Sequence, residues 1–180
     1  MLNKARSSTK SEMLMSNISH FRGVVHAAHL EWYQLGESSL RPNPNNEKGH
    51  IITLASRMQM FRQALVCIVF CGVYLGALLV IKGRRKFGEK KWDKYFDKLI
   101  YEAKLELLGC SDLGIITKCR QFRKARNDII HERPEFIFNL KKRKDISKET
   151  KNAIDLIKLL EAHFSIKNAD KFYKTMHEFF

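Results

Sequence analysis

The stretch ALVCIVFCGVYLGALLVI, residues 64–81, contains no charged side chain and almost no polar one. Eighteen such residues reach the usual length threshold for a helix that crosses a membrane, but a helix buried on all sides in a bundle or a dimer core has the same composition. The helical pattern begins before the run, near residue 51, so the apolar part is one section of a longer element. We therefore expect a central core helix over residues 51–82, with a membrane span from Ala64 to Ile81 as the alternative.

Further helical patterns lie on both sides of this run, and we see almost no segment that alternates with the period of a strand. The sequence therefore predicts an all-α fold in three parts: a disordered N-terminus (1–11), an N-terminal helix and loop (12–50) and a helical domain (51–180). The loop is expected over residues 37–48 because RPNPNN breaks regular structure. The remaining helices are expected at 12–35, at 91–108 ending at Gly109, from Ser111 or Asp112 onward, from Ser147 after a basic loop 141–146, and at 169–180.

The chain is strongly basic, with 33 Lys and Arg against 19 Asp and Glu, a formal net charge of +14. The charge is clustered: eight basic residues lie between Lys82 and Lys98, and Lys141–Lys144 form a second block. A balance of this size favours polyanionic partners, which are RNA, DNA or an anionic membrane surface.

Cysteines and histidines give no sign of a disulfide framework or a metal site. The four cysteines include no CxxC pair and are expected to be buried reduced thiols. His26 and His29 lack the companion ligands that a metal site needs, so we expect neither a metal nor another cofactor. The polar start MLNKARSSTKSE lacks the hydrophobic core of a secretory signal. We expect a cytoplasmic protein or, if residues 64–81 span a membrane, an inner-membrane anchor whose C-terminal part faces the cytoplasm.

The motif RNDIIH, residues 126–131, follows a helix with one apolar face. That face is formed by Ile115, Ile116, Cys119 and Phe122, and Arg126 continues it, so its charge points where the sequence otherwise places carbon. A buried arginine must be paired or must serve a site, because an unpaired buried charge is costly. His131 lies about 140° round a regular helix from Arg126. Either the helix ends between them, as Pro134 suggests, or a second copy of the chain completes the site.

This motif resembles the Arg-Asn-x-x-x-His motif of HEPN domains, and the order of helices is similar to theirs over about residues 55–165. The resemblance implies an up-and-down helical bundle, with the N-terminal helix and C-terminal helices flanking it. It implies a metal-independent endoribonuclease that works as a homodimer with a composite site at the interface. The implied catalytic residues are Arg126, His131 and Asn127; the residues expected to hold the RNA backbone are Arg120, Arg123, Lys124 and Arg133.

The biology that the family implies is toxin–antitoxin or antiviral (abortive infection) defence, with an antitoxin or regulatory protein as a further partner. One departure is visible: a large branch of the family has a tyrosine two residues after the histidine, where this chain has Arg133. Two other functions remain open. One is a single-pass membrane-anchored basic effector; the other is a non-catalytic HEPN-like scaffold that binds nucleic acid or protein.

Overall fold

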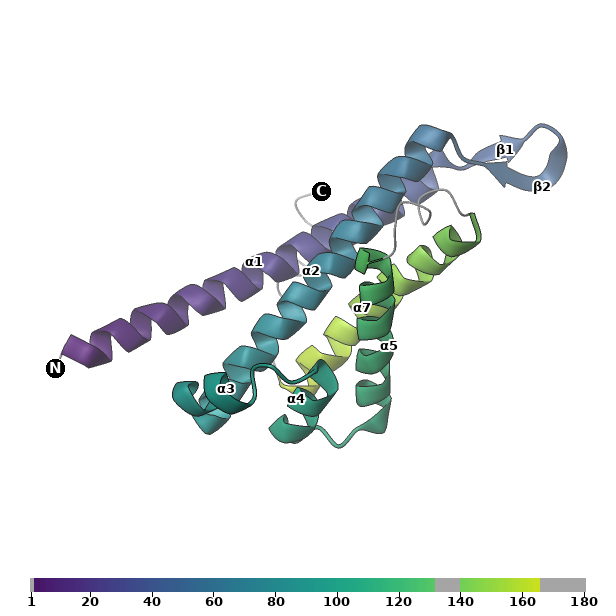
Figure 1. Ribbon diagram of the computed structural model, residues 1–180. Coiled ribbons are helices and arrows are strands. Elements are labelled where there is room, and N and C mark those ends of the chain that lie inside the picture. The colour runs from purple at the N-terminus through teal and green to yellow at the C-terminus, as the bar shows by residue number, and fades with distance from the viewer. Residues whose placement is uncertain (1, 132–139, 166–180) are drawn as a thin grey trace.

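The computed structural model describes residues 2–131 and 140–165, and side chains within residues 18–45, 50–130 and 146–165. The fold is all-α, as the sequence predicts, apart from one short β-hairpin. Two long antiparallel helices run side by side and are joined at one end by the hairpin, while the shorter helices pack along α2 (Figure 1). The elements are α1 (Leu2–Ser39), β1 (Arg41–Asn43), β2 (Asn46–Ile51), α2 (Leu54–Phe87), α3 (Glu89–Tyr95), α4 (Tyr101–Leu108), α5 (Leu113–His131) and α7 (Leu140–His163).

Helix α2 is the centre of the core, and it contacts α1, α3, α4, α5 and α7. Thr53 caps its start, because its side chain accepts a hydrogen bond from the backbone N–H of Ser56, and the chain leaves the helix at Gly88 with φ 84°. Within the described part of the chain, α2 is the one helix long and apolar enough to cross a membrane, and 56% of its most apolar window is buried inside the protein. More than half of this window therefore packs against other parts of the protein.

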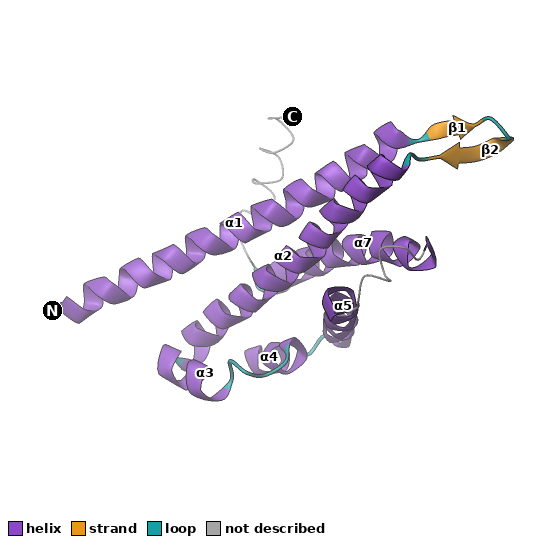
Figure 2. Cartoon of the chain, turned by 45° about the horizontal axis from the view of Figure 1, so that its top comes forward, coloured by secondary structure: helices purple, strands orange, loops and turns teal. Residues whose placement is uncertain are grey.

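Three segments differ from the expectations at the N-terminal end. The helix α1 begins at Leu2, so it includes the stretch 2–11 that was expected to be disordered. It also extends to Ser39, beyond the expected end at residue 35. The expected loop contains the antiparallel pair β1–β2 instead, because Asn43 accepts a hydrogen bond from the backbone N–H of Asn45 and closes a tight turn (Figure 2).

The expected helix 91–108 is two helices, α3 and α4, separated by a turn. Trp92 is fully buried against Gly83, near the end of α2, whereas Tyr101 donates a hydrogen bond to the carbonyl of Gly72 at 3.0 Å. These two contacts lie eleven residues apart on α2, about 16 Å along its axis. Trp92 and Tyr101 are nine residues apart, so one regular helix would direct their side chains to opposite sides, about 180° apart, and could not bring both to α2.

The C-terminal part differs from the expectation at its start. Helix α7 begins at Leu140, so the expected basic loop 141–146 is helical and Ser147 is not the first residue of the helix. The expected core positions Ile154, Ile157 and Leu160 are buried, as the period of the sequence predicts. The expected terminal helix 169–180 lies outside the described residues.

Candidate active site

Helix α5 carries the motif, and its start and buried face are as predicted. The Asp112 carboxylate accepts hydrogen bonds from the backbone N–H groups of Gly114 at 2.8 Å and Ile115 at 3.2 Å, which satisfies two of the free donors at the start of a helix. The apolar face predicted from the spacing is buried; its members are Ile115, Ile116, Cys119 and Phe122. These contacts fix the rotation of α5, so the next position on the same face, Arg126, turns toward α2.

Arg126 lies directly on the backbone of α2, where Gly72 leaves room for it. A Cβ atom added to Gly72 would lie 2.3 Å from Nε and 2.6 Å from Cδ of Arg126. The Nε atom is buried and has no hydrogen-bond partner among the described residues. A buried N–H without a partner costs about 1–3 kcal/mol. In the described part of the chain, packing against α2 rather than a charge partner holds this arginine in place.

Tyr101 of α4 borders the same position. Its hydroxyl donates to the Gly72 carbonyl at 3.0 Å, next to the place where Arg126 crosses α2. Burial raises the pKa of Tyr101, and the positive charge of Arg126 opposes that shift. Burial likewise raises the pKa of Cys71 well above its usual value, again against the effect of Arg126. Arg126 therefore lies among groups that are neutral near pH 7.

Helix α5 continues without interruption from Arg126 to His131. The expectation that the helix ends between these two residues is therefore wrong, and the 140° separation applies. One regular helix cannot direct both side chains toward one point. Asn127 is half-buried, next to Arg126. The side chain of His131 and the whole of Arg133 lie outside the described residues.

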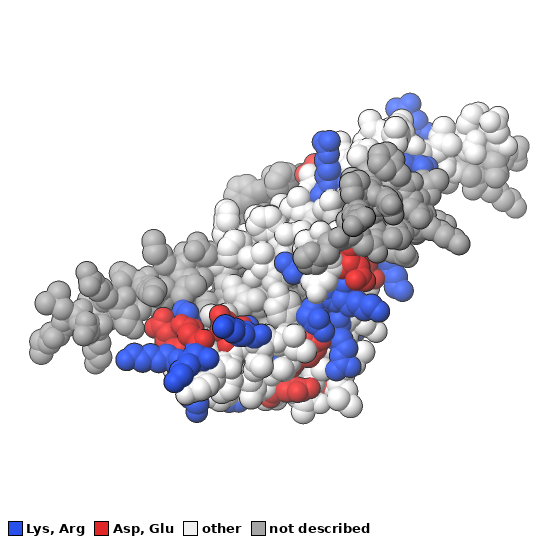
Figure 3. All heavy atoms as spheres, in the orientation of Figure 1, with Lys and Arg blue, Asp and Glu red and all other residues white. Residues whose placement is uncertain are grey.

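The arginines expected to hold RNA differ in their surroundings. Arg123 donates three hydrogen bonds of 3.1–3.2 Å to Glu102, a buried carboxylate of α4. Arg120 is 66% exposed and lies 3.8 Å from the same carboxylate, and Lys124 is exposed. Figure 3 shows basic side chains gathered over α5, so Arg120 and Lys124 present charge there while Arg123 joins α5 to α4.

Part of the basic cluster 82–98 also holds the fold together. The Lys82 ammonium donates to the carbonyl of Phe164 at 3.1 Å, and the Lys86 ammonium to the carbonyl of Leu107 at 3.0 Å. These lysines interact with the free carbonyls at helix ends, where a positive charge is stabilising. Lys82 and Lys86 therefore keep their charge but also stabilise the packing of the helices.

The four cysteines are free and buried, as expected. Burial and the nearby Glu102 carboxylate raise the pKa of Cys119 to about 12, and burial alone does the same for Cys67. A thiol in this state is not nucleophilic near neutral pH. Among the described residues, no group of three His, Cys, Asp or Glu side chains is placed to hold a metal ion.

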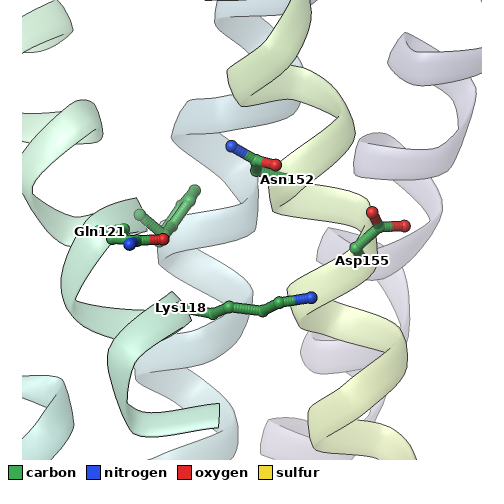
Figure 4. A pocket seen from close by; sticks show the side chains of 5 residues that line it. Lys118, Gln121, Asn152 and Asp155 are labelled. Atoms are coloured by element: carbon green, nitrogen blue, oxygen red, sulfur yellow. The ribbon is translucent and has the colours of Figure 1, made fainter. Parts of the chain in front are cut away.

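A pocket of about 50 Å³ lies between α5 and α7 and is separate from Arg126 (Figure 4). It is lined by Lys118, Gln121, Phe122, Asn152 and Asp155. Lys118 extends from α5 toward α7 in this view. The pocket is small, and its open polar side chains give it no evident chemical role.

Two residues of the site were missed from the sequence, Gly72 and Tyr101. The signal for Gly72 was present, because a glycine inside an apolar helix often marks a close approach of another group. Nothing in the sequence indicated that the close approach is made by Arg126. No protein-family model, no curated protein and no solved structure matches this chain.

Proposed function

We propose that the chain is a metal-independent endoribonuclease of HEPN type that acts as a homodimer in toxin–antitoxin or antiviral defence. One observation carries the proposal: the motif arginine is partly buried against α2, and its buried Nε–H has no hydrogen-bond partner in the part of the chain that the structure describes. This is the arrangement expected of a cation that serves a site, because a cation with only a structural role is normally paired.

Two other partly buried arginines of this fold show the contrast. Arg123 is paired with Glu102, and Arg22 is paired with Glu161, to which its Nη2 donates a hydrogen bond of 3.0 Å. Each of these arginines, which stabilise the fold, therefore has a buried carboxylate as its partner. Among the described residues, Arg126 has no such carboxylate. Its Nε–H is buried against α2 but the side chain as a whole is only partly buried, so the other guanidinium donors are the ones that a phosphate group would meet.

The chemistry follows from the residue types. Cleavage of RNA without a metal requires that the 2′-hydroxyl lose a proton, attack the adjacent phosphorus and expel the 5′-oxygen, which gains a proton. A histidine with an ordinary pKa near 6.5 performs such proton transfers near neutral pH. The guanidinium of Arg126 stabilises the charge that develops on the phosphorane oxygens. The product carries a 2′,3′-cyclic phosphate and a free 5′-hydroxyl.

The continuous helix α5 supports a dimeric site. Since Arg126 and His131 diverge by about 140° on one helix, a site that needs both obtains one from each of two copies. Two such sites then form, related by the two-fold axis. The exposed Arg120 and Lys124 on α5 hold the RNA backbone, and binding weakens as salt rises.

The test is cleavage of a labelled RNA by the purified full chain in the presence of a chelator. Wild type is expected to release fragments that end in a 2′,3′-cyclic phosphate, and His131→Ala to release none. His163→Ala is the matched control, because His163 is an exposed histidine at the end of α7. Induction in a bacterium is expected to arrest growth and fragment RNA for wild type only. Equal behaviour of wild type and His131→Ala, with intact RNA, would leave a non-catalytic scaffold as the function.

A second candidate is a membrane-anchored effector, and the observation in its favour is that even the outward face of α2 is apolar. Against it, the opposite face of α2 packs against five other helices. That face also includes Tyr74, which donates a 2.7 Å hydrogen bond to the buried carboxylate of Glu161. Fractionation without detergent decides between them, since a spanning protein stays in the membrane pellet.

A further inference from the structure

The outward face of α2 is apolar where a surface helix normally carries polar residues. We define the outward stripe as the positions of α2 that share this face and are not buried: Arg62, Val66, Val69, Val73, Ala77, Val80 and Arg84. Val73 at its centre is 36% exposed. In Figure 3 the surface between the basic groups over α3 and those over α5 is largely uncharged. A continuous apolar strip of this kind marks a contact surface.

The outward stripe reads almost the same in both directions. Val69 and Ala77 lie four residues from Val73, and Val66 and Val80 lie seven residues from it. The terminal arginines, Arg62 and Arg84, lie eleven residues from it. A two-fold axis through Val73 would lay a second α2 antiparallel on the first, with Val66 opposite Val80 and Val69 opposite Ala77. Self-complementarity of this kind is what a symmetric contact between identical chains requires. The stripe is about 33 Å long from one arginine to the other.

The charges at the two ends fit the same arrangement. Arg84 is paired with Glu89 at 3.3 Å and with Asp93 at 2.9 Å, and these carboxylates are 55% and 42% exposed. The antiparallel arrangement brings Arg62 of one copy to Arg84 of the other, next to both carboxylates. Opposite charges therefore meet at each end of the stripe, although the chain as a whole is basic.

We infer that the outward stripe is the surface by which two copies of this chain associate, with the two-fold axis at Val73. This contact between copies is inferred from the residues of α2 and the charges at its ends, whereas its consequence for catalysis rests on the proposed function. Gly72, the residue before Val73, leaves room for Arg126 to lie against α2. Each Arg126 then lies within roughly one helix diameter, about 10 Å, of the axis, where the second copy can complete the site.

The test compares Val73→Arg with Leu54→Arg in the full chain, by sedimentation equilibrium without detergent. Leu54 is the matched control because it is 70% exposed at the start of the same helix, outside the stripe. Wild type and Leu54→Arg are expected to be dimers, and Val73→Arg a monomer with the helical content of wild type. Val73→Cys is expected to form a disulfide-linked dimer on mild oxidation, whereas Leu54→Cys is not; this pair decides the matter if Val73→Arg does not fold.

A monomeric wild type would overturn the inference, as would a dimer that Val73→Arg does not weaken and Val73→Cys does not cross-link. Association of wild type with anionic lipid vesicles in place of dimer formation, lost in Val73→Arg, would assign the stripe to a membrane surface instead. The RNA assay on the same proteins separates the two proposals. A dimer that cross-links through residue 73 but does not cleave RNA would refute the proposed function alone. A dimer that cleaves RNA and is insensitive to Val73→Arg would refute the proposed interface alone.

Discussion

Gly72→Ala should reduce RNA cleavage without unfolding the protein. The new Cβ would lie 2.3 Å from Nε of Arg126, whereas ordinary contact begins at 3.4 Å, so the guanidinium must move by about 1 Å. A displacement of about 1 Å at a reacting group can lower the rate roughly 100-fold. Alanine also favours the helix by up to about 1 kcal/mol relative to glycine, which offsets part of the lost packing. The expected result is a large loss of rate with little change in the free energy of unfolding.

Gly76→Ala is the matched control for this experiment. It adds the same methyl group one turn along α2, where the nearest heavy atom is the Tyr101 hydroxyl oxygen at an ordinary 3.8 Å. Cleavage rates are measured with a fluorogenic RNA in chelator, alongside urea unfolding and sedimentation of all three proteins. If Gly72→Ala cleaves RNA as fast as Gly76→Ala, the position of Arg126 does not matter for catalysis and the reasoning is refuted.

Three further predictions concern stability. Glu102→Gln should destabilise the fold by about 1–3 kcal/mol, measured by urea unfolding, because Arg123 loses its buried carboxylate; an unchanged midpoint would contradict this pairing. Gly83→Ala should cost about 1–3 kcal/mol, because the new methyl group would lie 2.2 Å from the buried ring of Trp92; its thermal midpoint should fall below that of wild type. Burial lowers the pKa of His26 from 6.5 to about 4, so the unfolded state binds more protons and stability should fall as the pH drops from 6.5 toward 4. His26→Gln should reduce this loss, and equal slopes for wild type and variant in unfolding between pH 7 and 4.5 would exclude His26 as its source.

The elements that the sequence predicted well are those that local periodicity determines. The buried face of α5 and the cap at Asp112 follow from spacings of three and four and from one side-chain oxygen, so both could be predicted. The break between α3 and α4 could not, because it depends on Trp92 packing against Gly83 of another helix.

The candidate site shows the same division. The inward direction of Arg126 followed from the apolar spacing, and the structure places it against Gly72. The partner of Glu102 could not be chosen from the sequence, because several basic residues of α5 lie within reach of α4 and only the helix rotation selects Arg123. Nor could the sequence show that Lys82 and Lys86 of the basic block 82–98 donate to carbonyl oxygens of other elements.

The central claim is that Arg126 and His131 act together from different copies of the chain, and complementation tests it directly. Arg126→Ala and His131→Ala are each expected to be inactive as purified homodimers. After the two are mixed and allowed to exchange subunits, half of the dimers contain one intact Arg126–His131 pair, so cleavage should recover to roughly a quarter of the wild-type rate. A mixture that forms mixed dimers, shown by differently tagged subunits, yet stays as inactive as its components would contradict the claim.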